Sequence, residues 1–303
     1  MSPALSSPLG TEIFLPILPG LAEGMLLLVI ATGLTLTFGT MRILNFAHGA
    51  FFMLGAFIAY SASVSWSQGQ TIIVPLVAAT VIVAGVGIVA ERVVYRRLYK
   101  FDSLRSLLGT FALFLVIAAI AQQIWGVSPL GANIPRRLGG HLSLFGVSIL
   151  TYQVFIIVVG IVVVVALRVW LIRSRMGLEV RAVAADREMT AALGVRSERV
   201  FWVMFAVGCG LAGLAGALIA PLVEVSTDLG ADYIVLAFAV VLVGGLGSFG
   251  GAVIASLVLG LVDAFTAAYV QNVEPYAIFL TMIVFLAIRP YGLFGSAAAV
   301  IEI

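Results

Sequence analysis

Charged side chains are scarce in this chain. Asp, Glu, Lys and Arg make up 10% of its 303 residues, whereas hydrophobic residues make up 62%. A soluble domain carries about 25% charged residues, because its surface must be hydrated. Several apolar runs reach the roughly 20 residues that an α-helix needs to cross a bilayer. The composition therefore excludes an ordinary soluble domain and predicts a polytopic membrane protein.

Residues that build metal, redox and nucleotide sites are also few. Cys209 is the single cysteine, which excludes an internal disulfide and a multi-cysteine metal site. The two histidines, His48 and His141, lack the HExxH or Cys/His spacing of a zinc site. The chain has no GxxxxGK[ST] motif, so it cannot bind ATP through a P-loop. We therefore expect no metal and no cofactor in this chain.

Two further classes of protein are disfavoured. Lys100 is the single lysine, and basic amphipathic runs are missing outside the loops, so the basic footprint of a nucleic-acid-binding protein is absent. A membrane-embedded enzyme is disfavoured because no acid-base or metal set converges in the sequence.

Hydropathy predicts about nine membrane spans. Eight to ten are compatible with the pattern, because boundaries drawn from periodicity slip by a few residues. The spans are expected at residues 20–39, 46–66, 71–94, 104–125, 149–172, 201–220, 233–246, 251–270 and 276–288. We expect one transmembrane domain over residues 1–303, an all-α bundle with broken or re-entrant segments.

Basic residues gather in two loops, which predicts the orientation. Together these loops hold 12 of the 16 Lys and Arg residues. The first contains Arg92, Arg96, Arg97, Lys100 and Arg105, and the second contains Arg168, Arg173, Arg175, Arg181, Arg187, Arg196 and Arg199. Because cytoplasmic loops are rich in Lys and Arg, both loops are predicted to be cytoplasmic, with residues 126–148 and 221–232 outside. Arg289 places the C-terminus inside, and Arg136 with Arg137 is a mild exception in an outer loop.

Two spans carry small residues every four positions, which places them on one helix face. They are Gly208, Ala212, Gly216 and Ala220 in one span, and Ala252, Ser256, Gly260 and Ala264 in the other. Small residues let membrane helices approach closely. Such faces predict a dense bundle, either by packing within one subunit or at a subunit interface.

Two stretches interrupt the apolar pattern and are candidates for a translocation path. Residues 41–56 include Asn45, His48 and Gly49, and residues 244–252 include Gly247 and Ser248. Paired interruptions in the two halves of a transporter point to a substrate path, because freed backbone groups at membrane depth must face protein or water. The alternatives are a cytoplasmic turn at 244–252 and a hydrogen-bonded interfacial histidine at position 48.

Ionisable residues in or near the spans are a further signal, because charge within a bilayer is expensive. The candidates are Glu23, Glu91, Asp263 and Glu274. Glu91 adjoins Arg92, and Glu274 precedes Pro275 in a predicted outer loop. Asp263 is the best buried candidate, with a transport role and a structural hydrogen-bonding role both open.

The longest polar segment between two long apolar runs is residues 173–199. We expect Gly177 at the C′ position of the preceding span and a short helix over residues 179–193. Ala182, Ala185, Met189 and Ala192 would form its small apolar face, Gly194 would end it, and Ser197 would cap the next helix. A short helix held between two spans can transmit a mechanical force to both of them.

This loop resembles the cytoplasmic coupling loop of ABC importer permeases, in which an alanine-rich helix is followed by glycine. The matching positions are Ala184, Ala185, Ala191, Ala192 and Gly194. More specifically, the chain resembles the branched-chain amino acid permease family of the LivH type. The motifs that carry this resemblance are NFAHGAFFMLGAF at 45–57, ERVVYRRL at 91–98, SRMGLEVRAVAADREMTAALGV at 174–195, VLVGGLGSFGGAVIASLVLG at 241–260 and RPYGLFG at 289–295.

The resemblance implies a complex in the bacterial inner membrane. Two permease chains, often non-identical, would work with two cytoplasmic ATPases that use ATP and Mg, and with an external solute-binding protein. The coupling loop would dock on the ATPase through Glu179, Ala184, Ala185, Glu188, Ala191, Ala192 and Gly194. Branched-chain or similar hydrophobic amino acids are the expected substrates, although relatives handle urea or short amides. A solitary secondary transporter or channel is the alternative from another class.

Overall fold

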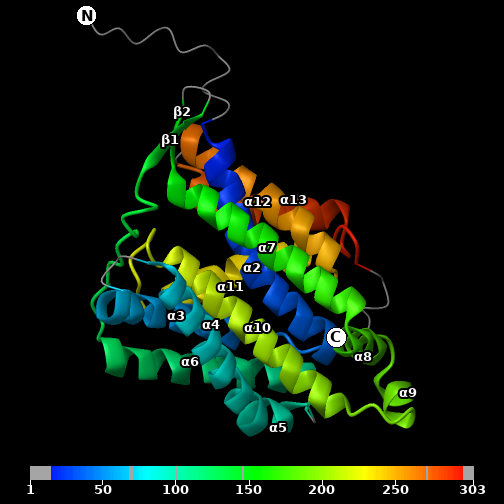
Figure 1. The fold of residues 1–303 in the computed structure, drawn as a ribbon. Coiled ribbons are helices and arrows are strands. Elements are labelled where there is room, and N and C mark those ends of the chain that lie inside the picture. Colours follow the sequence, from blue (N-terminus) through cyan, green and yellow to red (C-terminus); the bar gives the residue numbers. More distant parts are fainter. Residues whose placement is uncertain (1–14, 68–70, 100, 145–146, 271, 296–303) are drawn as a thin grey trace, which may run out of the picture.

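The computed structural model describes residues 15–67, 71–99, 101–144, 147–270 and 272–295 (Figure 1). Helices dominate these residues, and the single sheet among them has two strands. Lys100, counted above in the first basic loop, lies outside the described residues.

Seven helices in the described part of the chain are long and apolar enough to cross a membrane. They are α2 (Ile17–Met41), α3 (Ala47–Ala62), α4 (Ile73–Ala90), α6 (Ser103–Trp125), α7 (Thr151–Arg173), α10 (Ser197–Ile219) and α12 (Phe249–Tyr269). Helix α3 continues as a π-helical turn at Ser63–Ser67, and α4 continues through a second one at Glu91–Tyr95 into α5 (Arg96–Leu98).

Two shorter apolar helices complete the set, α11 (Leu229–Gly244) with 16 residues and α13 (Glu274–Ile288) with 15. All nine predicted apolar segments are therefore helical, and the all-α polytopic membrane fold is confirmed. The last two helices fall below the roughly 20 residues that cross a bilayer unaided, so by length the structure has seven full spans.

Helix α2 lies in the middle of the bundle, where α12, α10, α7 and α11 pack around it (Figure 1). Residues 26–38 are all buried. A helix that is apolar on every side is expected to be buried, and small residues let its neighbours approach. Gly24 lies against the backbone of Ser256, and Gly33 lies against Gly208.

The two predicted small-residue faces pack within this chain. Gly208 meets Gly33 and Thr37 of α2, while Gly260 meets Gly20 and Gly24. Ala212, Gly216 and Ala252 are also buried. The structure therefore favours packing inside one subunit over a subunit interface for both faces.

One end of the bundle joins the two segments predicted to lie outside. Leu130 and Val225 exchange backbone hydrogen bonds of 3.0 and 2.8 Å. An antiparallel hairpin of β1 (His141–Leu144) and β2 (Val147–Leu150) lies in the first of these segments and pairs His141 with Leu150. The sequence analysis did not predict this hairpin.

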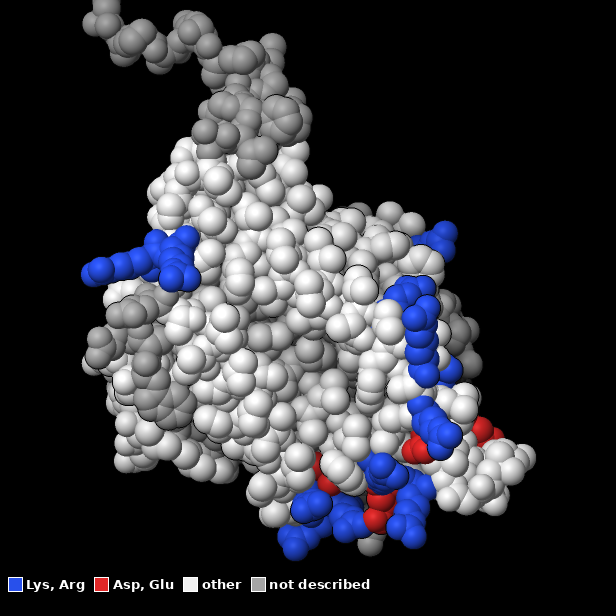
Figure 2. All heavy atoms as spheres, viewed as in Figure 1, with Lys and Arg blue, Asp and Glu red and all other residues white. Residues whose placement is uncertain are grey.

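The opposite end carries the arginines. Helices α8 (Arg175–Ala185) and α9 (Arg187–Ala192) connect α7 to α10 there, close to α5. Figure 2 shows most of the visible Arg side chains at this end, around α5, α8, α9 and the start of α10. The two predicted arginine loops thus share one end of the bundle, and an ion pair between Arg96 and Glu198 joins them.

Candidate functional site

The polar segment at residues 173–199, called the polar loop below, contains two helices. The prediction of one helix over residues 179–193 was therefore wrong. Asp186 has an extended backbone, with φ −154° and ψ 107°, and separates α8 from α9. Its carboxylate accepts a hydrogen bond of 2.9 Å from the Met189 amide. Asp is a preferred N-cap residue, because its side chain pairs with an amide that the first turn leaves free. This local bond ends one helix and begins the next.

Helix α8 is fixed tightly to the end of α7. Ser174 caps α8 by accepting a hydrogen bond of 2.9 Å from the Gly177 amide. A Cβ atom at Gly177 would lie 2.2 Å from the Leu171 carbonyl oxygen, so only glycine allows this approach. The Arg181 guanidinium donates a hydrogen bond to the same Leu171 carbonyl. The prediction that Gly177 follows the end of α7 at its C′ position was therefore wrong, since Gly177 lies within α8.

The inner face of α8 belongs to a small apolar cluster. Val180 and Val183 are 5% and 3% exposed, and they pack with residues of α2, α7 and α10. The partners are Leu36, Leu167, Val200, Phe201 and Met204. Because these five residues come from three long helices, a displacement of α8 must displace or strain all three.

Helix α9, by contrast, presents most of its side chains outward, and Thr190 is its buried residue. Met189 is 61% exposed and Leu193 is 78% exposed. Of the predicted coupling residues, Glu179 and Ala184 are half-buried, whereas Ala185, Glu188, Ala191, Ala192 and Gly194 are exposed. Gly194 has φ 88° and follows the helix end, as predicted. Ser197 is the first residue of α10 and does not cap it, because the N-cap position is occupied by Arg196.

Aromatic residues connect this surface to the first arginine loop. The Arg187 guanidinium lies 4.8 Å above the Phe201 ring, and Phe201 contacts Tyr99 at a ring distance of 5.2 Å. The Tyr99 hydroxyl donates a hydrogen bond of 3.2 Å to the Glu91 carboxylate. Burial, and then the nearby Glu91 charge, raise the pKa of Tyr99 well above its usual value, so the hydroxyl stays protonated. Sequence reasoning missed Tyr99, which carries no motif.

The first predicted path element lies deep in the bundle. Helix α2 ends at Met41 and α3 begins at Ala47, so the predicted break is present. Asn45 is 1% exposed and accepts a hydrogen bond from the Tyr95 hydroxyl. His48 is fully buried, and its Nε2–H donates to the Ile30 carbonyl at 3.0 Å. Gly49 faces Gly230 of α11 so closely that a Cβ atom would lie 2.2 Å from the Gly230 oxygen.

The second element is a glycine turn between α11 and α12. Gly245 and Gly247 have φ values of 99° and 77°. Ser248 caps α12 by accepting a hydrogen bond of 3.1 Å from the Gly251 amide. The C-terminal segment closes over the turn, because the Leu293 amide donates to the Val243 carbonyl at 2.8 Å. The turn lies at the arginine-rich end, in agreement with the alternative of a simple turn between two helices.

The predicted path residues lie at different heights along α2. Asp263 interacts electrostatically with Glu23, near the start of α2. His48 contacts Ile30 in the middle, and Gly247 lies against Gly39 near the end. With a rise of 1.5 Å per residue, Glu23 and Gly39 are about 24 Å apart. The structure therefore does not gather these residues into one site, but it distributes Asp263, His48 and Gly247 along α2.

The family described as "Branched-chain amino acid transport system / permease component" matches residues 17–289. The chain belongs to this permease family. The family resemblance drawn from the motifs is therefore confirmed.

Curated relatives of this permease match over nearly their full length. The protein "High-affinity branched-chain amino acid transport system permease protein BraD" of Pseudomonas aeruginosa is 31% identical over 91% of this chain and 94% of the relative. The permease protein LivH of Escherichia coli K12 is 28% identical over 91% and 93%. A probable LivH of Methanocaldococcus jannaschii is 25% identical over 89% of each chain. No solved structure matches the permease.

Proposed function

We propose that this permease is a subunit of an ATP-driven ABC importer that moves branched-chain or similar hydrophobic amino acids across the bacterial inner membrane. The observation that carries the proposal is the polar loop, in which an exposed helix, α9, follows a helix, α8, that is anchored to the bundle. The relatives support the substrate class, because their names specify branched-chain amino acid transport.

The proposed complex contains a second permease, identical or homologous, two cytoplasmic ATPases and an external solute-binding protein. ATP and Mg would bind to the ATPases. The ATPase would contact the exposed apolar tip of α9 around Met189, Ala192 and Leu193. Apolar side chains at a surface rich in arginine are typical of a contact with another protein.

Force from the ATPase would reach the bundle through α8. The Gly177 contact and the Arg181 hydrogen bond couple α8 to α7, and Val180 and Val183 couple it to α2 and α10. Helix α2 contacts both predicted path stretches and helix α12, which carries Asp263. Its displacement would therefore change the surroundings of the predicted path residues Asn45, His48, Gly49, Gly247, Ser248 and Asp263. We propose that these residues line or control the path as access alternates between the two sides.

The docking step is tested by replacing Leu193 with Asp in the complete complex. A charge at the centre of a docking surface costs about 2 kcal/mol, or about thirtyfold in affinity. We expect Leu193→Asp to lose the ATPase in affinity purification and to lose ATP-dependent uptake in proteoliposomes. The control is Val127→Asp, which alters a side chain that is 77% exposed at the opposite end of the bundle and should retain the ATPase.

Two results would contradict the proposal. Normal ATPase binding and uptake with Leu193→Asp would exclude docking at α9. Uptake by the permease alone, without ATP or partners, would favour a solitary transporter or channel. Ligand binding to the partner solute-binding protein then separates amino acids from urea or short amides as the substrate.

A further inference from the structure

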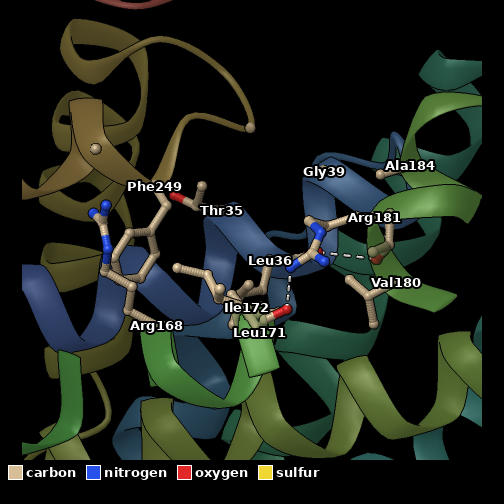
Figure 3. Close-up of a pocket in the computed structure, with 13 residues that line it drawn as sticks. Thr35, Leu36, Gly39, Arg168, Leu171, Ile172, Val180, Arg181, Ala184 and Phe249 are labelled. Atoms are coloured by element: carbon tan, nitrogen blue, oxygen red, sulfur yellow. Dashed lines mark hydrogen bonds between the residues drawn. The ribbon is translucent and has the colours of Figure 1, made fainter. Parts of the chain in front are cut away.

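A cavity of about 340 Å³ lies between α2, α7, α8 and the start of α12 (Figure 3). Its volume falls in the range of about 300–1,000 Å³ that is common for small-molecule sites. Leu36, Leu171, Ile172, Val180 and Phe249 provide apolar walls. The cavity therefore combines apolar surface from three helices of the bundle with the anchored helix of the polar loop.

Two guanidinium groups and no carboxylate border this cavity among the residues that the structure describes. Figure 3 shows Arg168 beside Phe249 and Arg181 above Leu171. Arg181 donates to the Leu171 carbonyl and keeps further N–H groups available, since a guanidinium has five. Within the described residues, Arg168 has neither a hydrogen bond nor an ion pair. Among the residues that the structure describes, the cavity lining thus carries two positive charges and no negative one, and an anion would balance them.

The position of Arg168 also indicates the source of the anion. Helix α7 has the highest mean hydropathy of the seven long helices, 3.0, and most of its surface is exposed. Arg168 precedes the end of α7 at Arg173 by five residues, or about 8 Å. A long basic side chain this close to the end of a membrane helix can reach towards the phosphates of the lipid headgroups.

We propose that this cavity binds one anionic phospholipid. Its headgroup phosphate accepts hydrogen bonds from Arg181, and also from Arg168 once that exposed side chain, which lies beside Phe249 in Figure 3, turns towards Arg181. A guanidinium matches phosphate oxygens in shape and charge. The first part of an acyl chain lies against Ile172, Val180 and Phe249. Basic pockets between membrane helices on the cytoplasmic side are typical lipid headgroup sites. The bound lipid would bridge α8 and α12, and this goes beyond the proposed coupling role.

The test measures lipid retention by the purified permease in phosphatidylcholine nanodiscs that contain a minor fraction of phosphatidylglycerol. Native mass spectrometry counts the phosphatidylglycerol molecules that remain bound. We expect Arg168→Gln to lower retention about tenfold, since a hydrogen bond to a charged group contributes about 1.5 kcal/mol. Arg181→Gln should lower it as well. Arg173→Gln is the matched control, because it removes the same charge at the same end, outside the cavity lining.

A second variant tests the cavity without changing any charge. A Cβ atom at Gly250 would meet nothing within 4 Å, and Gly250 lines the cavity. Gly250→Leu should therefore fill the space with little strain and should also reduce phosphatidylglycerol retention. In detergent, inorganic phosphate is not expected to displace the lipid.

Four results would overturn the proposal. Equal losses in Arg168→Gln and Arg173→Gln would mean that the lipid responds only to the overall charge of this end. Unchanged retention in Gly250→Leu would place the lipid elsewhere. Equal retention of phosphatidylcholine, or full displacement by inorganic phosphate, would contradict recognition of an anionic headgroup together with its acyl chain.

Discussion

Helices α8 and α9 are neighbours in one loop, yet they differ in almost every contact. Helix α8 is held by the Ser174 cap, the Gly177 contact and the Arg181 hydrogen bond, and its valines are buried. Helix α9 is held by the Asp186 cap and by Arg187 on Phe201, and its apolar side chains are exposed. The difference matches the two roles that we propose, in which α9 binds the ATPase and α8 transmits the displacement to the bundle.

The largest effect is expected from separating α8 from α7. Gly177→Val would place side-chain atoms against the Leu171 carbonyl, so the contact must open, at a cost of about 3 kcal/mol. We expect a lower thermal unfolding temperature of the purified permease and loss of ATP-dependent uptake, while the ATPase still binds α9. Affinity purification and uptake assays separate the two functions.

The control for this change is Gly85→Val. Gly85 lies in α4, and a Cβ atom there would meet nothing within 4 Å. This variant should unfold and transport like the natural permease. Normal uptake with Gly177→Val would contradict the role of α8 as the mechanical connection.

A smaller effect should distinguish the two helix caps. Ser174→Ala removes the cap of α8 and Asp186→Ala removes that of α9, each at a cost of about 1 kcal/mol. Hydrogen exchange should speed up at the amides of the affected helix. Because α8 has other contacts and α9 has few, we expect Asp186→Ala to expose all of α9, whereas Ser174→Ala affects the first turn of α8. The same response in both helices would remove the distinction between them.

The smallest effect concerns Tyr99, which supports Phe201 beneath Arg187. Tyr99→Phe removes the hydrogen bond to Glu91, at a cost of about 0.5 kcal/mol. The pKa of Tyr99 is raised in the folded protein, so its stabilising contribution is complete below the unfolded pKa of about 10. That contribution decreases as pH rises above this value, because the unfolded chain ionises first. Tyr99→Phe should reduce the loss of thermal stability between pH 9 and pH 11, roughly, and an unchanged profile would contradict this assignment.

The sequence predicted the parts of the fold that depend on local pattern. Apolar runs located all nine helices, and Gly194 was correctly placed after a helix, because a left-handed backbone favours glycine. The interior of α2 and the intramolecular packing of Gly208 and Gly260 depend on which helices meet. Single-sequence reasoning could state that these residues pack closely, but it could not name their partners.

The errors in the loop have physical causes that can be identified. Asp186 stands among good helix formers, and only its extended backbone and side-chain cap divide the segment. Ser174 and Asp186 are both common N-cap residues, so a closer reading of caps would have found two helices. Gly177 was assigned to a helix end because glycine often serves there, but here it permits close contact with Leu171. The roles predicted for the path residues depend on motion, and they stay predictions.

Site-specific photo-crosslinking tests the central proposal most directly. A benzophenone attached to Ala191→Cys of α9, in a Cys209→Ala background, is compared with the same probe on Val127→Cys at the opposite end. In the assembled complex we predict an adduct between position 191 and the ATPase, and none between position 127 and the ATPase. The assignment of α9 as the surface that binds the ATPase would be contradicted if neither position captured the ATPase, or if both positions captured it equally.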